Sequence, residues 1–413
     1  MGLPTPVKAT LRRVAPRAFK RTPNPLAFMR DAWYFITDCS QDLFACTTTS
    51  FKTWGDWRDW FIRNKVLKFC STQRKAIYVV FDAELYVPRS KDVLRREQRD
   101  AGKPVLEEDE REIADHIPLP KWSLVTATRA IRPALIDFVL EGIRNLSWGQ
   151  TRGVNIYSNC PHTGQFVLLT EETPEATALM PPPHRIGEGE MLARHVWDHI
   201  VGVERERHEC AMMCSGSESG SGSGPTFESI LKKHPIAILR STDGDTFPIF
   251  TITDATGMHI MLNEVGVNAH NQVIPLPRNA PKSAKRQEFL DCGELRRVLT
   301  EEHKLCLLSL SFVFTLCKSD YCKGFKGVGA QSIMDGVFPE AAEQRRAEMQ
   351  QRKAAKSGAK QPALPLVSVV PAIRKKKSTL REALVSLKPA PEQETLKLVP
   401  RLNLDKVDAY IKT

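Results

Sequence analysis

The sequence has no hydrophobic run long enough to cross a membrane. Its longest apolar stretch, LCLLSLSFVFTLC at residues 305–317, contains two serines and is only about half the length that a spanning helix requires. The stretch therefore predicts a buried helix, and we expect no membrane partner. We expect no secretory signal peptide, and the ten cysteines have irregular spacings. Both points argue against a small disulfide-stapled secreted protein and favour free thiols in a reducing compartment.

Acidic residues are absent from the first thirty positions, which contain seven Lys or Arg before Asp31. Mitochondrial transit peptides share this composition. Prolines at positions 4, 6, 16, 23 and 25 would interrupt the amphipathic helix that such a peptide needs. We therefore expect a basic segment that belongs to the fold rather than a transit peptide.

Positive charge is the clearest feature that the composition does contain. The 413 residues include 59 Lys and Arg against 48 Asp and Glu, which gives a net charge of +11. This balance favours a polyanionic partner such as nucleic acid, although many basic proteins bind none. A hydrophobic fraction of 42% is ordinary for a globular chain, so a folded core is expected.

Aspartates follow three short apolar runs that resemble buried strands. AWYFITD ends at Asp38, AIYVVFD ends at Asp82, and HPIAILRSTDGD carries Asp243 and Asp245. Runs rich in Ile, Val, Tyr and Phe predict parallel strands of an α/β sheet, whose carboxyl ends meet at one edge. We therefore expect the four acids to gather at that edge.

Two glutamates precede a predicted helix in RIGEGEMLARHVWDHIV. The helix dipole alone would account for one acid at this place, but Glu188 and Glu190 occur together. Clustered carboxylates repel one another and are usually neutralised by hard cations such as Mg²⁺ or Mn²⁺. Two such ions about 4 Å apart can promote in-line hydrolysis of a phosphodiester.

Other segments are irregular. Residues 89–115 are densely charged and predict a solvated helix, and residues 155–169 alternate in a way that predicts a hairpin. Residues 207–226 end in a Gly/Ser tract and predict a flexible loop. The folded domain is expected to end at residue 338, followed by a basic Pro/Lys-rich tail over 339–413 that we expect to be disordered.

Taken in order, several motifs resemble the XPG/flap endonuclease family of structure-specific 5′ nucleases, in the PIN-like superfamily. They are MG, RRVAPRAF, FITDCSQDLFA, VVFDAE, GEGE, STDGD, EFLDCGELRRVL and CKSDYCKGFKGVGAQSI. The resemblance covers roughly residues 1–335. It implies an α/β fold with a central, mostly parallel sheet flanked by helices, a helical arch and a helix-three-turn-helix DNA-binding element. The nuclease domain would comprise an N-terminal region to about 115, an inserted arch and hairpin region over about 116–182, and an internal region over about 183–338.

The family pattern implies two Mg²⁺ ions, with Mn²⁺ as a substitute, held by seven carboxylates. On this chain these are Asp38, Asp82, Glu188, Glu190, Asp243, Asp245 and Asp320. The resemblance also implies catalytic cations at Arg89 and Arg96, with Lys91 and Arg95 competing for these roles or for DNA contacts. Their task would be to neutralise the scissile phosphate. The alternative for each is a solvated basic helix.

Further positions are implied to contact DNA. Gly324, Gly327 and Gly329 would let the backbone approach a phosphate, with a K⁺ ion at this turn. An ordinary tight loop is the alternative. Gly2 belongs to the N-terminal motif, and Phe44 would stack on a base unless it packs in the core.

The chain also departs from the family. LPTPVK follows MG, the interval from Asp82 to Glu188 is long, and GEGE resembles the 5′ to 3′ exoribonuclease branch. These departures indicate a divergent member, with a virus among the candidate sources. One unusual spacing, His208, Cys210 and Cys214 with Cys160 and His162, leaves a zinc site open alongside plain thiols.

We expect a magnesium-dependent nuclease acting on flapped, nicked or branched DNA in replication, repair or recombination. The alternatives are an exoribonuclease or host-shutoff-like RNase of the same superfamily, and a non-catalytic nucleic-acid-binding scaffold. The RKKK cluster at residues 374–377 favours the nucleus, or the cytoplasm for a viral protein, over the mitochondrion. STLREAL lacks the aromatic pair that family members use on the sliding clamp, so clamp binding is not predicted.

Overall fold

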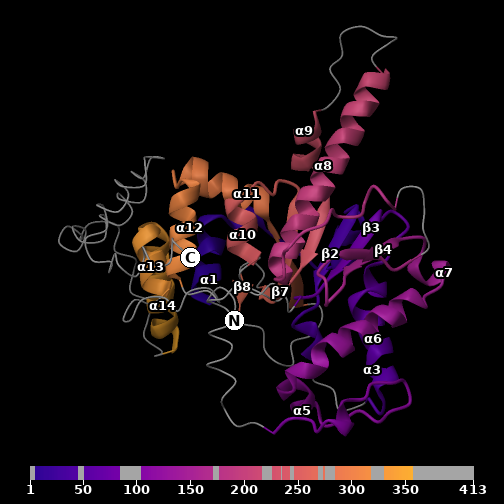
Figure 1. The fold of residues 1–413 in the computed structure, drawn as a ribbon. Coiled ribbons are helices and arrows are strands. Elements are labelled where there is room, and N and C mark those ends of the chain that lie inside the picture. The colour runs from indigo at the N-terminus through magenta and orange to yellow at the C-terminus, as the bar shows by residue number, and fades with distance from the viewer. Residues whose placement is uncertain are drawn as a thin grey trace, which may run out of the picture. The chain divides into compact units, whose positions relative to one another are not determined.

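The computed structural model describes residues 5–44, 51–83, 104–170, 176–215, 226–233, 235–241, 246–267, 273–274, 284–317 and 330–356. The chain divides into two compact units. One runs from Phe19 to Gly293, and the other combines Met1–Ala18 with Glu294–Thr413. Figure 1 labels their helices and strands.

The unit over residues 19–293 is built on a mixed sheet of nine strands. Their order is β1-β9-β7-β6-β2-β3-β4-β5, with β8 paired to β7. The strands are β1 (Phe19–Thr22), β2 (Tyr34–Asp38), β3 (Ala76–Val80), β4 (Asn155–Asn159), β5 (Phe166–Leu168), β6 (Ala237–Arg240), β7 (Met258–Val267), β8 (Val273–Ile274) and β9 (Lys285–Asp291). Neighbours within the central series β7-β6-β2-β3-β4 pair in parallel, and the remaining pairs are antiparallel. The predicted α/β class with a mostly parallel central sheet is confirmed.

The parallel register brings the carboxyl ends of β2, β3 and β6 to one edge. Asp38 lies opposite Val80, and Thr37 lies opposite Arg240. Every residue of β2 and β3 is buried, as continuous apolar runs require when both faces of a sheet are covered. The three strands predicted from runs ending near aspartates are therefore present. The hairpin predicted at residues 155–169 is formed by β4 and β5.

Helices cover both faces of this sheet. They are α2 (Pro25–Arg30), α3 (Trp54–Lys65), α5 (Trp122–Ala127), α6 (Arg132–Arg144), α7 (Trp148–Thr151), α8 (Gly189–Ser215), α9 (Phe227–Lys233) and α10 (Thr246–Ile252), with short 3₁₀ turns at Asp42–Phe44, Leu67–Phe69, Asp109–Arg111 and Arg129–Ile131. Phe35 and Ile77 pack in one core cluster with α3 and α6, whereas α8 contacts β2 and β3 from the other face (Figure 1). This division follows from the alternation of side chains along a strand.

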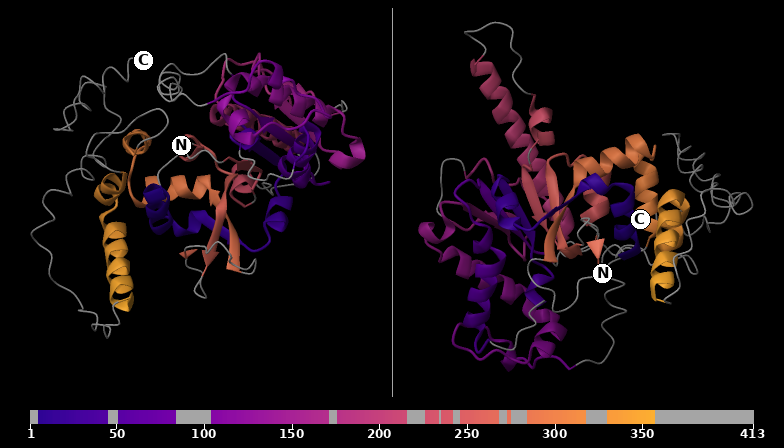
Figure 2. Two further views of the ribbon diagram at one scale, coloured as in Figure 1. Left: turned by 90° about the horizontal axis from the view of Figure 1, so that it is seen from below. Right: turned by 180° about the vertical axis from the view of Figure 1, so that it is seen from behind.

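The helix α8 is anchored to the sheet at a second point far from its start. Its buried Glu204 accepts hydrogen bonds from the Tyr34 hydroxyl and from Lys75 Nζ, the latter at 2.7 and 2.8 Å. Tyr34 begins β2, and Lys75 directly precedes β3. One helix therefore contacts the amino ends of the same two strands whose carboxyl ends carry Asp38 and Asp82. Figure 2 shows α8 continuing beyond the sheet.

Two local predictions in this unit need correction. Residues 207–215, predicted to belong to a flexible loop, are helical, because α8 continues to Ser215 and no Pro or Gly interrupts residues 203–215. In the described part of the predicted charged helix, residues 104–115, only a 3₁₀ turn forms. Pro104 and the like-charge run EEDE both disfavour a helix there.

The other unit is helical in its described part. It contains α1 (Thr5–Val14), a 3₁₀ turn (Pro16–Ala18), the end of α11 (Cys292–Arg297), a π-helix (Val298–Glu302), α12 (Leu307–Leu316), α13 (Ala330–Val337) and α14 (Pro339–Lys356). The buried helix predicted at residues 305–317 corresponds to α12, where Leu310, Val313 and Phe314 are buried. No helix of the described residues is long and apolar enough to cross a membrane.

Both ends of this unit differ from the sequence expectation. The prolines at positions 4 and 6 were expected to interrupt a helix, but Pro6 lies in the first turn of α1, where a missing N–H does no harm. The tail was predicted from residue 339, yet α14 extends from there to Lys356, because Ala, Glu, Gln, Arg and Met favour helix. Arg13 of α1 pairs with Glu348 of α14 at 2.7 Å.

Candidate metal centre

Three buried carboxylates come together at the carboxyl edge of the parallel strands. One oxygen each of Asp82, Glu188 and Glu190 lies within 4.8 Å of the other two. Glu188 and Glu190 are only 2% and 1% exposed. Among the described residues, this is the one group of His, Cys, Asp or Glu side chains close enough to hold a metal ion.

Backbone hydrogen bonds join the two segments that carry these acids. Ala83 N–H donates to the Gly187 carbonyl at 2.7 Å. Gly189 N–H donates to Asp82 Oδ1 at 2.9 Å. Gly189 is the first residue of α8, so the Asp82 carboxylate accepts a bond from an N–H group that the helix itself leaves without a partner. The end of β3 and the start of α8 are thereby held in fixed register.

The glycine between the two glutamates is required by this close approach. A Cβ atom at Gly189 would lie 2.9 Å from Asp38 Oδ1 and 3.0 Å from Asp82 Oδ1. A Cβ atom essentially never comes as near as 2.9 Å to another atom, so a side chain at this position would push the Asp38 carboxylate out of place. The order of residues in GEGE therefore has a steric reason: the backbone must pass directly against two carboxylates.

Asp38 lies beside the three clustered acids. Its Oδ1 accepts from Ser40 N–H at 3.1 Å and its Oδ2 accepts from Ser241 Oγ at 3.0 Å. Ser40 Oγ also donates to Asp82 Oδ1 at 3.0 Å. Burial, followed by the charges of Asp82 and Glu190, raises the pKa of Asp38 to about 7. Four of the seven predicted carboxylates are therefore gathered in one place.

The donor set fits a hard divalent cation. Every candidate ligand is a carboxylate oxygen, the type that Mg²⁺ and Mn²⁺ prefer. The raised pKa of Asp38 means that adding another negative charge to the centre is unfavourable. A bound cation would reverse this preference, because it stabilises all the ionised forms at once.

Two residues that support Asp82 were not identified from the sequence. Asn159, at the end of β4, accepts from Phe81 N–H at 2.8 Å and donates to the Phe81 carbonyl at 2.7 Å. It therefore fixes the backbone directly before Asp82. Arg132, the first residue of α6, places Nη2 3.0 Å from Asp82 Oδ2. Both residues lie far from Asp82 in the sequence, so no local pattern indicated them. The one local sign of a close approach was the glycine between Glu188 and Glu190.

A second group of charged side chains forms around Asp42, four residues after Asp38. Asp42 accepts hydrogen bonds from both terminal nitrogens of Arg240 and from Lys65 Nζ at 2.8 Å. Burial alone would raise the pKa of Asp42, but the hydrogen bonds and charges of Arg240 and Lys65 lower it. Arg240 also donates to Thr37 Oγ1 at 3.2 Å. This group, hereafter the Asp42 ion group, ties β2, β6 and α3 together.

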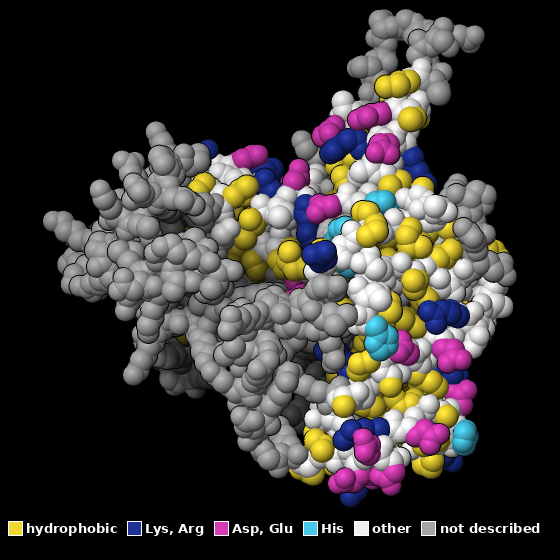
Figure 3. Space-filling view, viewed as in Figure 1, with side chains coloured by type: hydrophobic (Ala, Val, Ile, Leu, Met, Phe, Trp, Pro, Cys, Tyr) yellow, Lys and Arg dark blue, Asp and Glu magenta, His cyan; other side chains and the backbone are white. Residues whose placement is uncertain are grey.

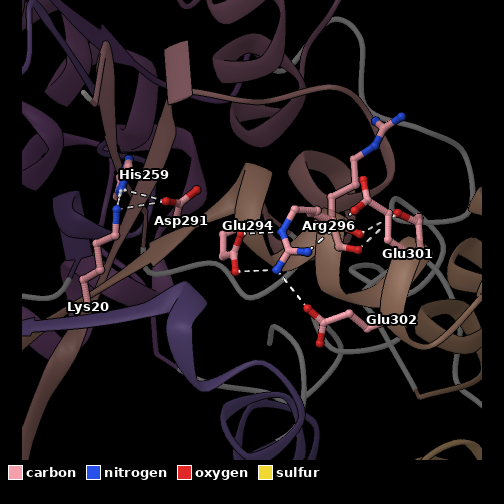
Figure 4. Close-up of polar contacts among 9 residues, drawn as sticks. Lys20, His259, Asp291, Glu294, Arg296, Glu301 and Glu302 are labelled. Carbon is pink, nitrogen blue, oxygen red and sulfur yellow. Dashed lines mark hydrogen bonds and ion pairs between the residues drawn. The ribbon is translucent and has the colours of Figure 1, made fainter. Parts of the chain in front are cut away.

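A third polar group links the antiparallel strands of the same unit. Lys20 Nζ lies 2.9 Å from Asp291 Oδ2 and 3.1 Å from His259 Nε2 (Figure 4). Burial, together with the Lys20 charge and despite Asp291, lowers the pKa of His259 to about 4. Lysine can only donate, so His259 Nε2 accepts. In the other unit, Arg297 is bonded to Glu294 and Glu302.

Phe44 is half-buried against the main core, and its carbonyl accepts from Trp122 Nε1 at 3.1 Å. The other predicted site residues lie outside the described residues. They are the metal ligands Asp243, Asp245 and Asp320, the cations Arg89, Lys91, Arg95 and Arg96, and the DNA contacts Gly2, Gly324, Gly327 and Gly329. The glycine-rich turn of the helix-three-turn-helix element, at residues 318–329, falls there as well. The inserted arch and hairpin region predicted over about 116–182 is mostly described, and its described part forms α5, α6, α7, β4 and β5.

Of the residues considered for zinc, His162 pairs with Asp137 at 2.9 Å, and His208 lies against the ring of Phe227. The Cys214 side chain lies outside the described residues. Cys160 and Cys210 are free thiols, as are the other cysteines that the structure describes.

On the face seen in Figure 3, Lys and Arg side chains are mixed with acidic ones over the described surface. The net positive charge is therefore not gathered on this part of the molecule.

No family model matches the chain, and no curated protein sequence matches it. Two solved structures of the catalytic core of Rad2 in complex with DNA substrate are similar to it. For complex II the TM-score is 0.33 at 14% identity, over 85% of this chain and 80% of that chain. For complex III the TM-score is 0.33 at 14% identity, over 97% of this chain and 93% of that chain. Values this low support no conclusion about activity, which has to come from the metal centre itself.

Proposed function

We propose that the protein is a Mg²⁺-dependent nuclease that hydrolyses phosphodiester bonds in flapped, nicked or branched DNA. The observation that carries this proposal is the cluster of Asp82, Glu188 and Glu190, with Asp38 beside it, at the carboxyl edge of a parallel sheet. Open α/β sheets bind their ligands at this edge. Mn²⁺ is expected to substitute for Mg²⁺.

The chain's own residues would prepare the site in three ways. Asp82, Glu188 and Glu190 would hold the ion, and Asp38 would complete the ligand set when ionised. Ser40 and Gly189 orient Asp82 through hydrogen bonds at 3.0 and 2.9 Å. Asn159 fixes the backbone before it. Bound ions would supply an activated water and stabilise the leaving oxygen.

A nucleic acid is the substrate that best fits the remaining chemistry. The chain carries a net charge of +11 together with an acidic centre, so long-range attraction of a polyanion can coexist with local repulsion that metal ions relieve. The glycine-rich sequence after Asp320 favours duplex DNA, whereas GEGE favours RNA. We favour DNA, because the former pattern is the longer and more specific one.

A non-catalytic scaffold explains the centre less well. Gathering buried carboxylates is unfavourable unless a cation neutralises them. A protein that only holds a polyphosphate would gain nothing from such a cluster facing it. The RKKK sequence supports a nuclear location as part of the same proposal.

The test uses the purified full-length protein and labelled flap, nicked-duplex and single-stranded substrates of DNA and RNA. We expect cleavage of the flap and nicked DNA in millimolar Mg²⁺ or Mn²⁺ and none in EDTA. Glu190→Gln should abolish cleavage, whereas Glu209→Gln, on an exposed part of the same helix, should not. Preferential cleavage of RNA would identify the exoribonuclease alternative. Binding without cleavage in any metal would identify the scaffold.

A further inference from the structure

Arg132 brings a positive charge directly to the candidate metal centre. Its Nη2 atom lies 3.0 Å from Asp82 Oδ2, and its side chain is only 17% exposed. Asp82 Oδ1 accepts from Ser40 and Gly189, so the two oxygens of Asp82 have different partners. Oδ2 is bonded to a cation that a metal ion would have to displace or share.

Local helix chemistry does not account for an arginine at this position. Arg132 is the first residue of α6, where the helix dipole disfavours positive charge. The first turn of α6 contains no acidic residue, and the preceding Ile131 makes no side-chain capping bond. The position therefore gains its cation at a cost in helix stability. The contact with Asp82, which comes from a different element, offsets that cost.

The Arg132 guanidinium also has a donor that makes no hydrogen bond in the part of the chain that the structure describes. Its Nε atom is buried and has no hydrogen-bond partner among the described residues. An arginine presents a planar fork of donors that matches two oxygens of a phosphate. A guanidinium held beside the candidate metal centre with one donor left unused by the described residues is suited to bind an anion that arrives with the metal.

We propose that Arg132 contacts the substrate phosphodiester: it pairs with Asp82 while the centre is free of metal, and it would turn to a non-bridging phosphate oxygen when a bound cation neutralises Asp82. This inference depends on the proposed function, because it assumes that a phosphodiester reaches the centre. Arg132 would then have two opposite effects. It would weaken binding of the metal ion by competing for Asp82, and it would strengthen binding of the nucleic-acid phosphate.

The opposite signs make the inference testable. In the full-length protein without nucleic acid, Mn²⁺ affinity measured by calorimetry should rise about twofold to fivefold in Arg132→Gln, because a competing ion pair is lost. In Ca²⁺, flap-DNA affinity measured by fluorescence anisotropy should fall about tenfold, because a charged hydrogen bond is lost. Arg132→Lys should restore most of the Mn²⁺ competition but little of the DNA affinity, since lysine lacks the planar fork.

Arg144→Gln, at the other end of the same helix, is the matched control and should change neither affinity. A purely structural role for Arg132 predicts weaker binding of both Mn²⁺ and DNA, and that result would overturn the inference. So would an Arg132→Gln protein whose affinities equal those of Arg144→Gln. If the wild-type protein binds Mn²⁺ and Arg132→Gln binds it more tightly, but no substrate is cleaved, the proposed function fails while the competition at Asp82 stands.

Discussion

Asp38 and Asp42 are four residues apart and almost equally buried, at 4% and 2% exposure, yet their surroundings have opposite effects. Burial and two neighbouring carboxylates raise the pKa of Asp38 to about 7. Arg240 and Lys65 overcome the effect of burial and lower the pKa of Asp42. Burial alone therefore does not decide the state of a carboxylate.

The difference separates two uses of buried charge. The Asp42 ion group is neutralised by the protein's own cations, and it holds a strand, a second strand and a helix together. The candidate metal centre concentrates negative charge, which is unfavourable in a folded protein unless a cation neutralises it. The end of β2 and the 3₁₀ turn after it thus contribute one acid that pairs within the protein and one acid of the candidate metal centre.

The largest expected effect is on the cleavage rate, which should depend on the candidate metal centre. Asp82→Asn removes a metal ligand, so the rate of flap cleavage in Mg²⁺ should fall by about a thousandfold or more. Substrate binding should be equal or tighter, because a negative charge facing phosphate is lost. Single-turnover cleavage and anisotropy measure the two properties. Cleavage close to wild type would remove Asp82 from the centre.

The next effect is on stability. Asp42→Asn leaves the partly buried Arg240 and Lys65 with a neutral partner, which should cost about 3 kcal/mol of the free energy of unfolding. Urea denaturation of the metal-free protein measures it. Asp59→Asn, on the exposed side of α3, is the control and should change stability little. A loss in Asp42→Asn no larger than in the control would mean that the ion group does not hold these elements together.

Asp38→Asn should have the opposite sign in the same assay. Removing one of several mutually repelling carboxylates should stabilise the metal-free protein at pH 8 by on the order of 1 to 2 kcal/mol. The same substitution should reduce the stabilisation gained from Mg²⁺, because a ligand is lost. If both aspartate variants destabilise the metal-free protein equally, the contrast between the two groups is wrong.

The smallest effect is a dependence on pH. The pKa of Asp38 is raised from its ordinary 3.8 to about 7. Between these pH values the folded state therefore holds a proton that the unfolded state has lost. This residue's contribution makes metal-free stability fall as pH rises from about 4 to about 7. The decline should be shallower in Asp38→Asn and in the presence of Mg²⁺. Identical pH profiles for wild type and Asp38→Asn would contradict it.

Local patterns were enough to predict the parts of the site that depend on one segment. The buried strands β2, β3 and β6 are continuous apolar runs, and acids at the ends of β2 and β3 must meet in a parallel sheet. The same reasoning placed the two glutamates at the start of a long amphipathic helix. The sheet pattern alone thus brings Asp38 and Asp82 together, whereas it was the family resemblance that joined Glu188 and Glu190 to them as one ligand set. Asp243, Asp245 and Asp320 lie outside the described residues and remain predictions.

Contacts between distant segments could not be predicted in this way. Arg132 is fifty residues from Asp82, and Asn159 is seventy-eight residues from Phe81. Neither residue stands out in its local sequence, and the spacing of apolar residues around it does not indicate which strand end it will contact. The Asp42 ion group was missed for the same reason, since Arg240 and Lys65 come from separate elements. Side-chain pairing across a sheet depends on topology, which single-sequence patterns describe only coarsely.

The two attachments of α8 have a consequence for how this chain can change over evolutionary time. Glu190 at the metal centre and Glu204 at the opposite edge of the sheet are fourteen residues apart on one helix. An insertion of one residue between them would rotate the second anchor by about 100°, so this interval should keep a constant length among homologues. The Gly/Ser tract at residues 215–224 lies outside this interval in the sequence, so changes in its length would leave the spacing between the two anchors unchanged.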